Sequence, residues 1–177
     1  MIGVLVSGHG SNLQALIDAG LPIAAVASNR AGVRALERAE SAGIPARVFE
    51  LGRYSDRDAR DRDVADWLQL RGVDLVVLAG YMHLLTPSFL DRFPDRIVNV
   101  HPSLLPAFPG AHAVDDALSA GVEETGVTVH YVDEGLDTGA VIRQEPVPVE
   151  PRTTLLDRIH AVEHRLLPEV VQELCAR

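Results

Sequence analysis

The apolar run at residues 73–80, VDLVVLAG, constrains the fold more than any other segment of the chain. It is short, rich in valine and leucine, and lacks the apolar and polar alternation of a strand with one solvated face. Such a run is typical of a strand covered on both faces near the centre of a parallel sheet. The run IVNVH at 97–101 is expected to be its neighbour.

Helical segments alternate with further short apolar runs in the first part of the chain. This alternation predicts an α/β fold, an open and mostly parallel twisted sheet with helices on both faces, of the Rossmann-like kind. Strands are expected at 2–8, 23–28 and 46–49, and helices from Leu13 to Gly20, at 33–42 and at 56–70.

A different pattern follows the strand at 97–101. A helix near 112–120 precedes two runs, 125–132 and 139–149, that resemble a hairpin with a polar loop between them. A long helix then covers about 153–176, with a capping signal at Thr154 and Asp157 and with Pro168 expected to kink it. With 177 residues, 47% of them apolar, the chain is expected to fold as a single domain, 1–177.

Charge and cysteine content exclude several classes of function. The formal net charge of −9 and the absence of lysine argue against a nucleic-acid partner. An anionic ligand would have to be met by backbone N–H groups, a helix N-terminus or arginines. The one cysteine, Cys175, excludes a disulfide framework. No apolar run is long enough to cross a membrane, so we expect a cytoplasmic protein.

Asn99 and His101 lie two residues apart at the end of a predicted strand. Side chains at i and i+2 of a strand point to the same face, so both can converge on one reacting atom. Pro102 and Pro106 end the ladder pairing and place the two side chains at a mouth. An amide that stabilises an oxyanion and an imidazole that moves protons near neutral pH suit acyl-type chemistry.

The loop Gly8-His9-Gly10-Ser11-Asn12 joins the first strand to the first helix. Free N–H groups and the positive end of a helix dipole coincide there, which is typical of a phosphate site. It is neither a Walker loop nor a complete dinucleotide fingerprint, so a monophosphate fits best. The alternative is a plain strand-to-helix turn with Ser11 as the N-cap.

Asp137, in the polar loop between the hairpin strands, could reach His101, fix its tautomer and favour its charged form. The alternative is a solvated turn aspartate. A zinc site built from His101, His112, His130 and Asp137 is a further hypothesis. Spacings of 11 and 18 residues between these histidines match no compact zinc motif, and His112 and His130 are interpreted as core residues.

Two polar residues complete the candidates. Ser103 lacks the glycine-flanked elbow of a hydrolase nucleophile, so direct transfer between two bound substrates is favoured over an acyl-enzyme. Glu163 lies in or beside the apolar stripe of the last helix. Its carboxylate could bind ligand hydroxyls or could reach water from a border position.

Five motifs together, SGHGSNLQALIDA, VVLAGYM, NVHPSLLPAFPG, EGLDTG and VEH, resemble the phosphoribosylglycinamide formyltransferase family of folate-dependent formyltransferases. The resemblance runs essentially the full length. It implies transfer of a formyl group from 10-formyltetrahydrofolate, as co-substrate and without a metal, to glycinamide ribonucleotide in purine biosynthesis, by a monomer or a homodimer. It assigns the ribonucleotide to the 1–100 half, and the folate and catalysis to the 101–177 half.

The same resemblance implies roles for single residues. Asn99, His101 and Asp137 would be catalytic, Gly10, Ser11 and Asn12 would bind the phosphate, and Glu163 the ribose hydroxyls. Family members often carry arginine where His83 stands and lysine where Ala107 stands, which affects the expected binding of the folate tail. The implied folate-binding residues are Arg57, Met82, His83, Leu84, Leu85, Asn99, Val132, Asp133, Glu134, Gly135 and Leu136.

Three other functions compete with this interpretation. Formyl transfer to methionyl-tRNA would need an RNA-binding domain, for which the acidic chain leaves no room. Hydrolysis of the formyl-folate would need an additional N-terminal module, whereas the first predicted strand begins at residue 2. A phosphate-sensing module without catalysis would have no need of Asn99, His101 and Asp137 together.

Overall fold

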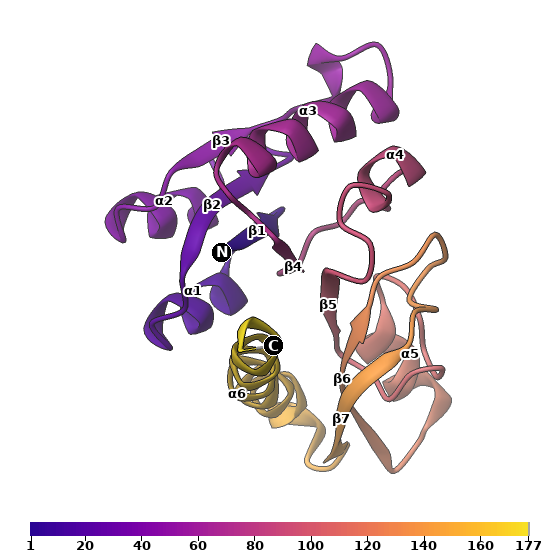
Figure 1. Cartoon of the computed structure of the whole chain (residues 1–177). Helices are drawn as coiled ribbons and strands as arrows, with labels where there is room; N and C mark the ends of the chain where they lie inside the picture. Colours follow the sequence, from indigo (N-terminus) through magenta and orange to yellow (C-terminus); the bar gives the residue numbers. More distant parts are fainter. Residues whose placement is uncertain (177) are drawn as a thin grey trace. The chain divides into compact units, whose positions relative to one another are not determined.

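The structure is a computed structural model that describes residues 1–176 (Figure 1). Its seven strands follow the order β3-β2-β1-β4-β5-β6-β7 in one sheet. β1 pairs in parallel with β2 and β4, β2 pairs in parallel with β3, and β7 is antiparallel to β6. The predicted open, mostly parallel sheet is therefore confirmed. The chain divides after Val98 into two compact units, which we describe in turn.

The first unit holds the parallel βαβ part of the chain. In Figure 1, α1 and α2 lie on one face of its strands and α3 lies on the other. Its elements are β1 (Ile2–Val6), α1 (Ser11–Asp18), β2 (Ile23–Ser28), α2 (Arg34–Ser41), β3 (Ala46–Val48), the 3-10 turn η1 (Leu51–Arg53), α3 (Arg57–Leu70), β4 (Leu75–Leu78), α4 (Pro87–Leu90) and the start of β5 (Ile97–His101).

β1 and β4 form the buried centre of this unit. Every residue of both strands is buried, as the doubly apolar run at 73–80 predicts. Gly3 of β1 is needed for close packing, because a Cβ there would lie 2.9 Å from Cγ1 of Val73 and 3.0 Å from Cδ2 of Leu68. Helix and sheet therefore approach closely on the α3 side.

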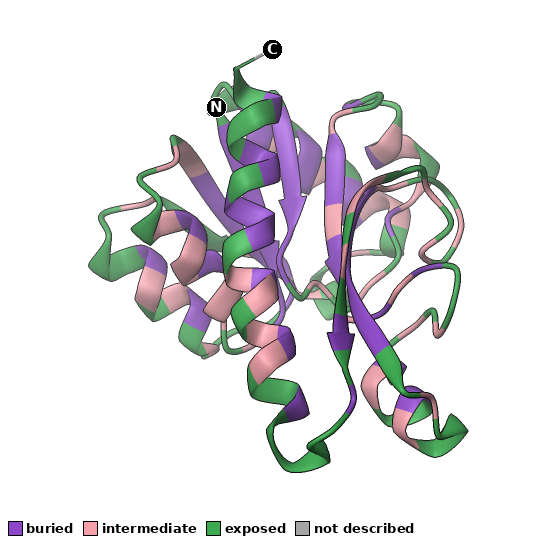
Figure 2. Ribbon diagram, turned by 90° about the horizontal axis from the view of Figure 1, so that it is seen from below, coloured by how far each residue is buried: buried purple, intermediate pink, exposed green. Residues whose placement is uncertain are grey.

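The second unit contains the hairpin and the long helix. β6 pairs with β7 in a register that sets Val127 opposite Glu145, and α6 packs against both strands. Figure 2 shows buried and exposed residues alternating along α6, as its amphipathic sequence requires. Its elements are the end of β5, α5 (Ala113–Ala120), β6 (Glu124–Tyr131), β7 (Val141–Pro148), the 3-10 turn η2 (Arg152–Thr154) and α6 (Leu155–Cys175).

Helix starts differ from the sequence prediction at two places. The N-cap of α1 is Gly10 at φ 74°, and Ser11 is already the first helical residue. Thr154 stands at the start of α6 but makes no capping hydrogen bond. Its hydroxyl donates to the carbonyl of Pro151 at 3.3 Å, and its oxygen accepts from Nε of Arg158 at 3.3 Å and not from a backbone N–H of the helix. The predicted capping box is therefore wrong. The short helix α4 was not predicted, since four residues show no periodicity.

Among the described residues, no helix combines the length and the apolar character that a membrane span requires.

Candidate active site

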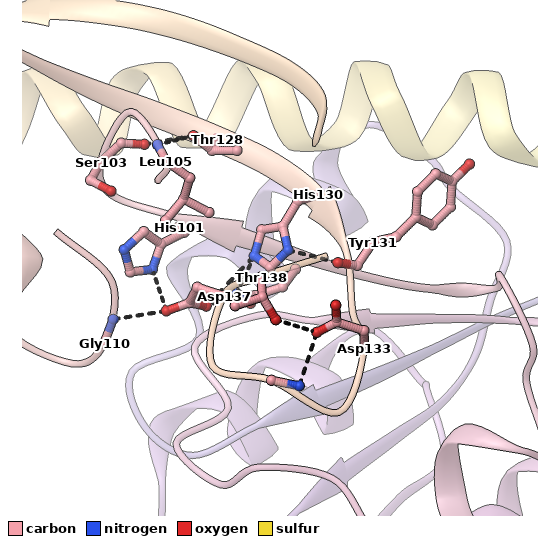
Figure 3. A network of polar contacts seen from close by, with 12 residues as sticks. His101, Ser103, Leu105, Gly110, Thr128, His130, Tyr131, Asp133, Asp137 and Thr138 are labelled. Carbon is pink, nitrogen blue, oxygen red and sulfur yellow. Dashed lines mark hydrogen bonds and ion pairs between the residues drawn. The ribbon is translucent and has the colours of Figure 1, made fainter. Parts of the chain in front are cut away.

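His101 lies at the end of β5 and is buried, with 4% of its surface exposed. Its Nε2 atom lies 2.8 Å from the carbonyl oxygen of Phe108, and its Nδ1 atom lies 3.4 Å from Oδ2 of Asp137 (Figure 3). Both ring nitrogens thus face oxygen acceptors. Because the neutral ring has one N–H and the charged ring has two, the imidazolium satisfies both contacts at once.

Asp137 reaches this cluster from the segment between β6 and β7, with a left-handed backbone at φ 54°. Its Oδ2 accepts the backbone N–H of Gly110 at 2.8 Å, and its side chain is 10% exposed. Burial by itself raises the pKa of the Asp137 carboxyl, but hydrogen bonds from His130 and Gly110 and the nearby His101 hold that pKa below its usual value. The cluster therefore contains a carboxylate at neutral pH.

Asn99, two residues before His101 on β5, is half-buried. Its Nδ2 atom lies 3.4 Å from Oδ1 of Asp137 and 3.2 Å from Nε2 of His130. The structure thus brings Asn99, His101 and Asp137 together around one carboxylate, although Asp137 is 38 residues from Asn99 in sequence. An amide N–H and an imidazole N–H beside each other can both donate to one carbonyl oxygen.

His130 belongs to the same cluster, whereas the sequence grouped it with His101 and Asp137 only in the zinc hypothesis and otherwise indicated a core residue. It is 2% exposed on β6, its Nδ1 lies 2.7 Å from the carbonyl oxygen of Tyr131, and its Nε2 lies 3.6 Å from Oδ1 of Asp137. The signal available was its place at the end of a predicted strand, directly before the Asp137 loop. The core interpretation of His112 is wrong, because His112 is exposed at the start of α5.

The turn after β5 is fixed by a buried threonine. The Thr128 hydroxyl donates to the carbonyl of Ser103 at 2.7 Å and accepts the N–H of Leu105 at 3.2 Å (Figure 3). The Ser103 hydroxyl in turn donates to the carbonyl of Ala107 at 2.5 Å. Ser103 is fully buried and bonded to backbone, so its role is structural and the turn holds His101 in place.

In the first unit, Gly10 shapes the candidate phosphate loop. A Cβ at Gly10 would lie 2.6 Å from Cβ of Ala35, whose N–H donates to the carbonyl of Gly8 at 3.1 Å. Ser11 and Asn12 open α1, where the first N–H groups have no partner within their own helix. Arg34 lies beside the loop, with Nη1 3.2 Å from Nε2 of His9. These groups can together bind an anion.

The remaining candidates of the first unit lie on one loop and on the helix beside it. Arg57, the first residue of α3, donates from Nη2 to the carbonyl of Leu84 at 2.6 Å. The side chains of Met82 and Leu84 are exposed, His83 is half-buried and Leu85 is buried. The loop therefore exposes two apolar side chains.

The remaining candidates of the second unit are Glu163 and the segment 132–136. Asp133 organises that segment, because its Oδ1 accepts the N–H of Gly135 at 3.0 Å and the hydroxyl of Thr138 at 2.7 Å. Val132 and Gly135 are half-buried, and Glu134 and Leu136 are exposed. Glu163 lies on α6 and is 6% exposed. Within residues 1–176, no three His, Cys, Asp or Glu side chains are grouped to hold a metal ion.

The strand order and the amide, imidazole and carboxylate cluster define an α/β protein equipped to act on a carbonyl carbon. The model of the formyl transferase family matches residues 1–171. The chain belongs to the formyl transferase family.

Relatives and solved structures agree on this family. The chain is 40% identical to "Phosphoribosylglycinamide formyltransferase" of Bacillus subtilis, over 97% of this chain and 92% of that protein. It resembles the crystal structure of phosphoribosylglycinamide formyltransferase from Streptococcus pneumoniae TIGR4 with a TM-score of 0.93 and 42% identity, covering 98% of this chain and 97% of that one.

Longer relatives contain a similar segment. The chain is 46% identical to "Trifunctional purine biosynthetic protein adenosine-3" of Drosophila pseudoobscura pseudoobscura, over 99% of this chain. It spans 14% of the length of that relative.

Proposed function

We propose that this protein transfers the formyl group of 10-formyltetrahydrofolate to the primary amine of glycinamide ribonucleotide. The observation that carries the proposal is the cluster of Asn99, His101 and Asp137, with contacts of 3.4 Å from the carboxylate to each of the other two. The similarity to the Bacillus subtilis and Streptococcus pneumoniae proteins, over nearly their whole length, supports these substrates.

In this proposal the ribonucleotide phosphate binds Gly10, Ser11 and Asn12. The left-handed Gly10 and the start of α1 supply N–H groups and a positive dipole end, which favour a phosphate. Glu163 accepts hydrogen bonds from the ribose hydroxyls, a role that suits the carboxylate of a residue on α6. The phosphate is thus assigned to the 1–100 half, as the resemblance implies.

The folate is assigned to two loops and one arginine. As the family resemblance implies, backbone groups of 82–85 and 132–136 hold the pterin. Arg57 faces the glutamate tail, and Asn99 contacts the formyl group. The 101–177 half thus provides His101, Asp137 and one of the two folate loops, and Asn99 lies two residues before His101 on β5.

The reaction follows from the hydrogen-bonding groups of the cluster. The ribonucleotide amine attacks the formyl carbon, and the carbonyl electrons move to oxygen. Asn99 Nδ2–H and a His101 N–H donate to that oxygen, which takes the place of the Phe108 carbonyl at Nε2. Asp137 stabilises the charged imidazole through Nδ1. The attacking nitrogen loses a proton, N10 of the folate gains one, and the bond from carbon to N10 breaks.

The test is to incubate purified protein with 10-formyltetrahydrofolate, with and without glycinamide ribonucleotide, and to follow the folate absorbance. We expect release of tetrahydrofolate that depends on the ribonucleotide, with formylated ribonucleotide as product. Release of formate without the ribonucleotide would instead indicate a hydrolase. Turnover with a different amine in place of the ribonucleotide would refute the proposed acceptor.

A further inference from the structure

Arg60 and Asp61, consecutive residues of α3, form a buried ion pair in the first unit. Arg60 donates to Oδ1 of Asp61 from Nη2 at 2.7 Å and from Nε at 2.9 Å. Their side chains are 0% and 1% exposed. Neighbouring residues of a helix do not face each other, so the arginine must turn back along its own helix to make this contact.

Stability alone does not account for this pair. Removing two charges from water carries a large desolvation cost. A protein with apolar residues of similar volume in place of a buried ion pair is often as stable or more stable. The exposed pair between Arg62 and Asp58 lies one turn apart on the same helix and follows the ordinary spacing of helix ion pairs. Arg60 and Asp61 are therefore better explained by the groups that they bind beyond α3.

Both residues bind the loop between β4 and α4. Oδ2 of Asp61 accepts the backbone N–H of Thr86 at 2.9 Å, and Nη1 of Arg60 lies 2.9 Å from Nδ1 of His83. Within the same loop, the N–H of Met82 donates to the hydroxyl of Ser7 at 2.9 Å. The 82–86 part of the loop is thus tied at Met82, His83 and Thr86, while the side chain of Met82 remains exposed.

The contact with Arg60 fixes the tautomer of His83. An arginine can only donate, so Nδ1 of His83 is the acceptor and the ring is neutral. Burial and the charges of Arg60 and Arg57 lower the pKa of His83, and Asp61 opposes them. The centroid of the Tyr81 ring lies 5.8 Å from that of His83. His83 therefore adds no charge to the loop at neutral pH.

We propose that Arg60 and Asp61 are positioning residues that set the conformation of the 82–86 loop for binding of the formyl-folate. The proposal rests on the proposed function, because that function assigns residues 82–85 to the folate. The two residues do not touch the ligand, since both side chains are buried. They act through the amide of Thr86 and the ring of His83.

The test is the double variant Arg60→Met/Asp61→Leu, which removes both charges and leaves neither unpaired. We expect its KM for 10-formyltetrahydrofolate to rise about tenfold, as for the loss of charge-assisted hydrogen bonds. Its KM for the ribonucleotide should stay within about twofold. The matched control is Arg62→Met, which removes an exposed arginine of the same helix and should change neither value.

Hydrogen exchange gives a readout that does not depend on activity. In the double variant the amides of residues 82–86 should exchange about tenfold faster or more, and in Arg62→Met at the wild-type rate. Thr86→Pro tests the same contact without altering α3. It deletes the N–H that Asp61 accepts, at a residue whose φ of −81° proline tolerates. It should raise the KM for the folate in the same direction.

The outcomes separate this proposal from the proposed function. Unchanged exchange of 82–86 in the double variant would overturn the positioning role. Faster exchange with an unchanged KM for the folate would overturn the link to folate binding. Absence of formyl transfer by the wild-type protein would refute the proposed function, while the exchange data would still decide whether the pair holds the loop.

Discussion

Asp137→Asn is the substitution that most directly tests the catalytic cluster. It keeps an oxygen that can accept the N–H of Gly110, 2.8 Å away in the wild type, and removes the negative charge beside His101. Two opposite charges 3.4 Å apart attract by about 5 kcal/mol at an effective dielectric constant of about 20. Partial solvation and the remaining amide dipole reduce this value.

We therefore expect kcat to fall by about 10²–10³, which corresponds to about 3–4 kcal/mol of lost transition-state stabilisation. The ribonucleotide dissociation constant, measured by calorimetry, should stay within about threefold, because this proposal gives Asp137 no contact with that substrate. Asp116→Asn, an exposed carboxylate on α5, is the control and should keep wild-type turnover. A kcat for Asp137→Asn within about threefold of wild type would refute the catalytic role.

The same substitution is expected to change how the free energy of unfolding depends on pH in the acid range. Because the folded protein holds the pKa of Asp137 below its usual value, the ionised form stabilises the fold. This contribution is present above the ordinary aspartate pKa of ~3.9 and is lost as the pH falls through the lowered value. Chemical unfolding between about pH 5 and 2 should therefore show a steeper loss of stability for wild type than for Asp137→Asn. Equal slopes would contradict this.

Three further substitutions test other parts of the site. Gly10→Ala adds a Cβ 2.6 Å from that of Ala35 at φ 74°, and should lose at least about 1 kcal/mol more unfolding free energy than Gly20→Ala, which meets no atom within 4 Å. Equal losses in thermal melts would rule out the Ala35 contact. Glu163→Gln should raise the ribonucleotide KM about tenfold with little change in kcat, and an unchanged KM would exclude a ribose contact. His130→Phe should lower kcat about tenfold, and an unchanged kcat would limit His130 to packing.

Sequence patterns predicted the elements whose signals are local. The doubly apolar run at 73–80 led to β4, and two apolar runs separated by a polar loop led to the β6–β7 hairpin. Helix α4 was not predicted from the sequence, because a single turn that starts at Pro87 is too short to show a helical periodicity. The cap at Thr154 does not form, because its hydroxyl oxygen accepts from Nε of Arg158 and not from a backbone N–H of α6.

The candidate site was less predictable, since its contacts join distant parts of the chain. The spacing of Asn99 and His101 on one strand is a local signal, whereas the approach of Asp137 depends on how the hairpin loop folds back. The sequence could not distinguish a His130 that contacts Asp137 from a histidine that only packs in the core. A buried histidine can do both, as His130 does in the structure. The Arg60 and Asp61 pair gave no signal, as adjacent opposite charges on a helix are common.

The side-chain bonds of Asp133 have a consequence for ligand binding. Because its carboxylate already ties together the N–H of Gly135 and the hydroxyl of Thr138, the segment that presents Asp137 loses much of its conformational entropy when the protein folds. A ligand that binds this segment then orders fewer flexible residues. Less of the free energy of its contacts is therefore offset by lost conformational entropy. Loosening that tie would weaken binding through entropy, even with every contacting atom still present.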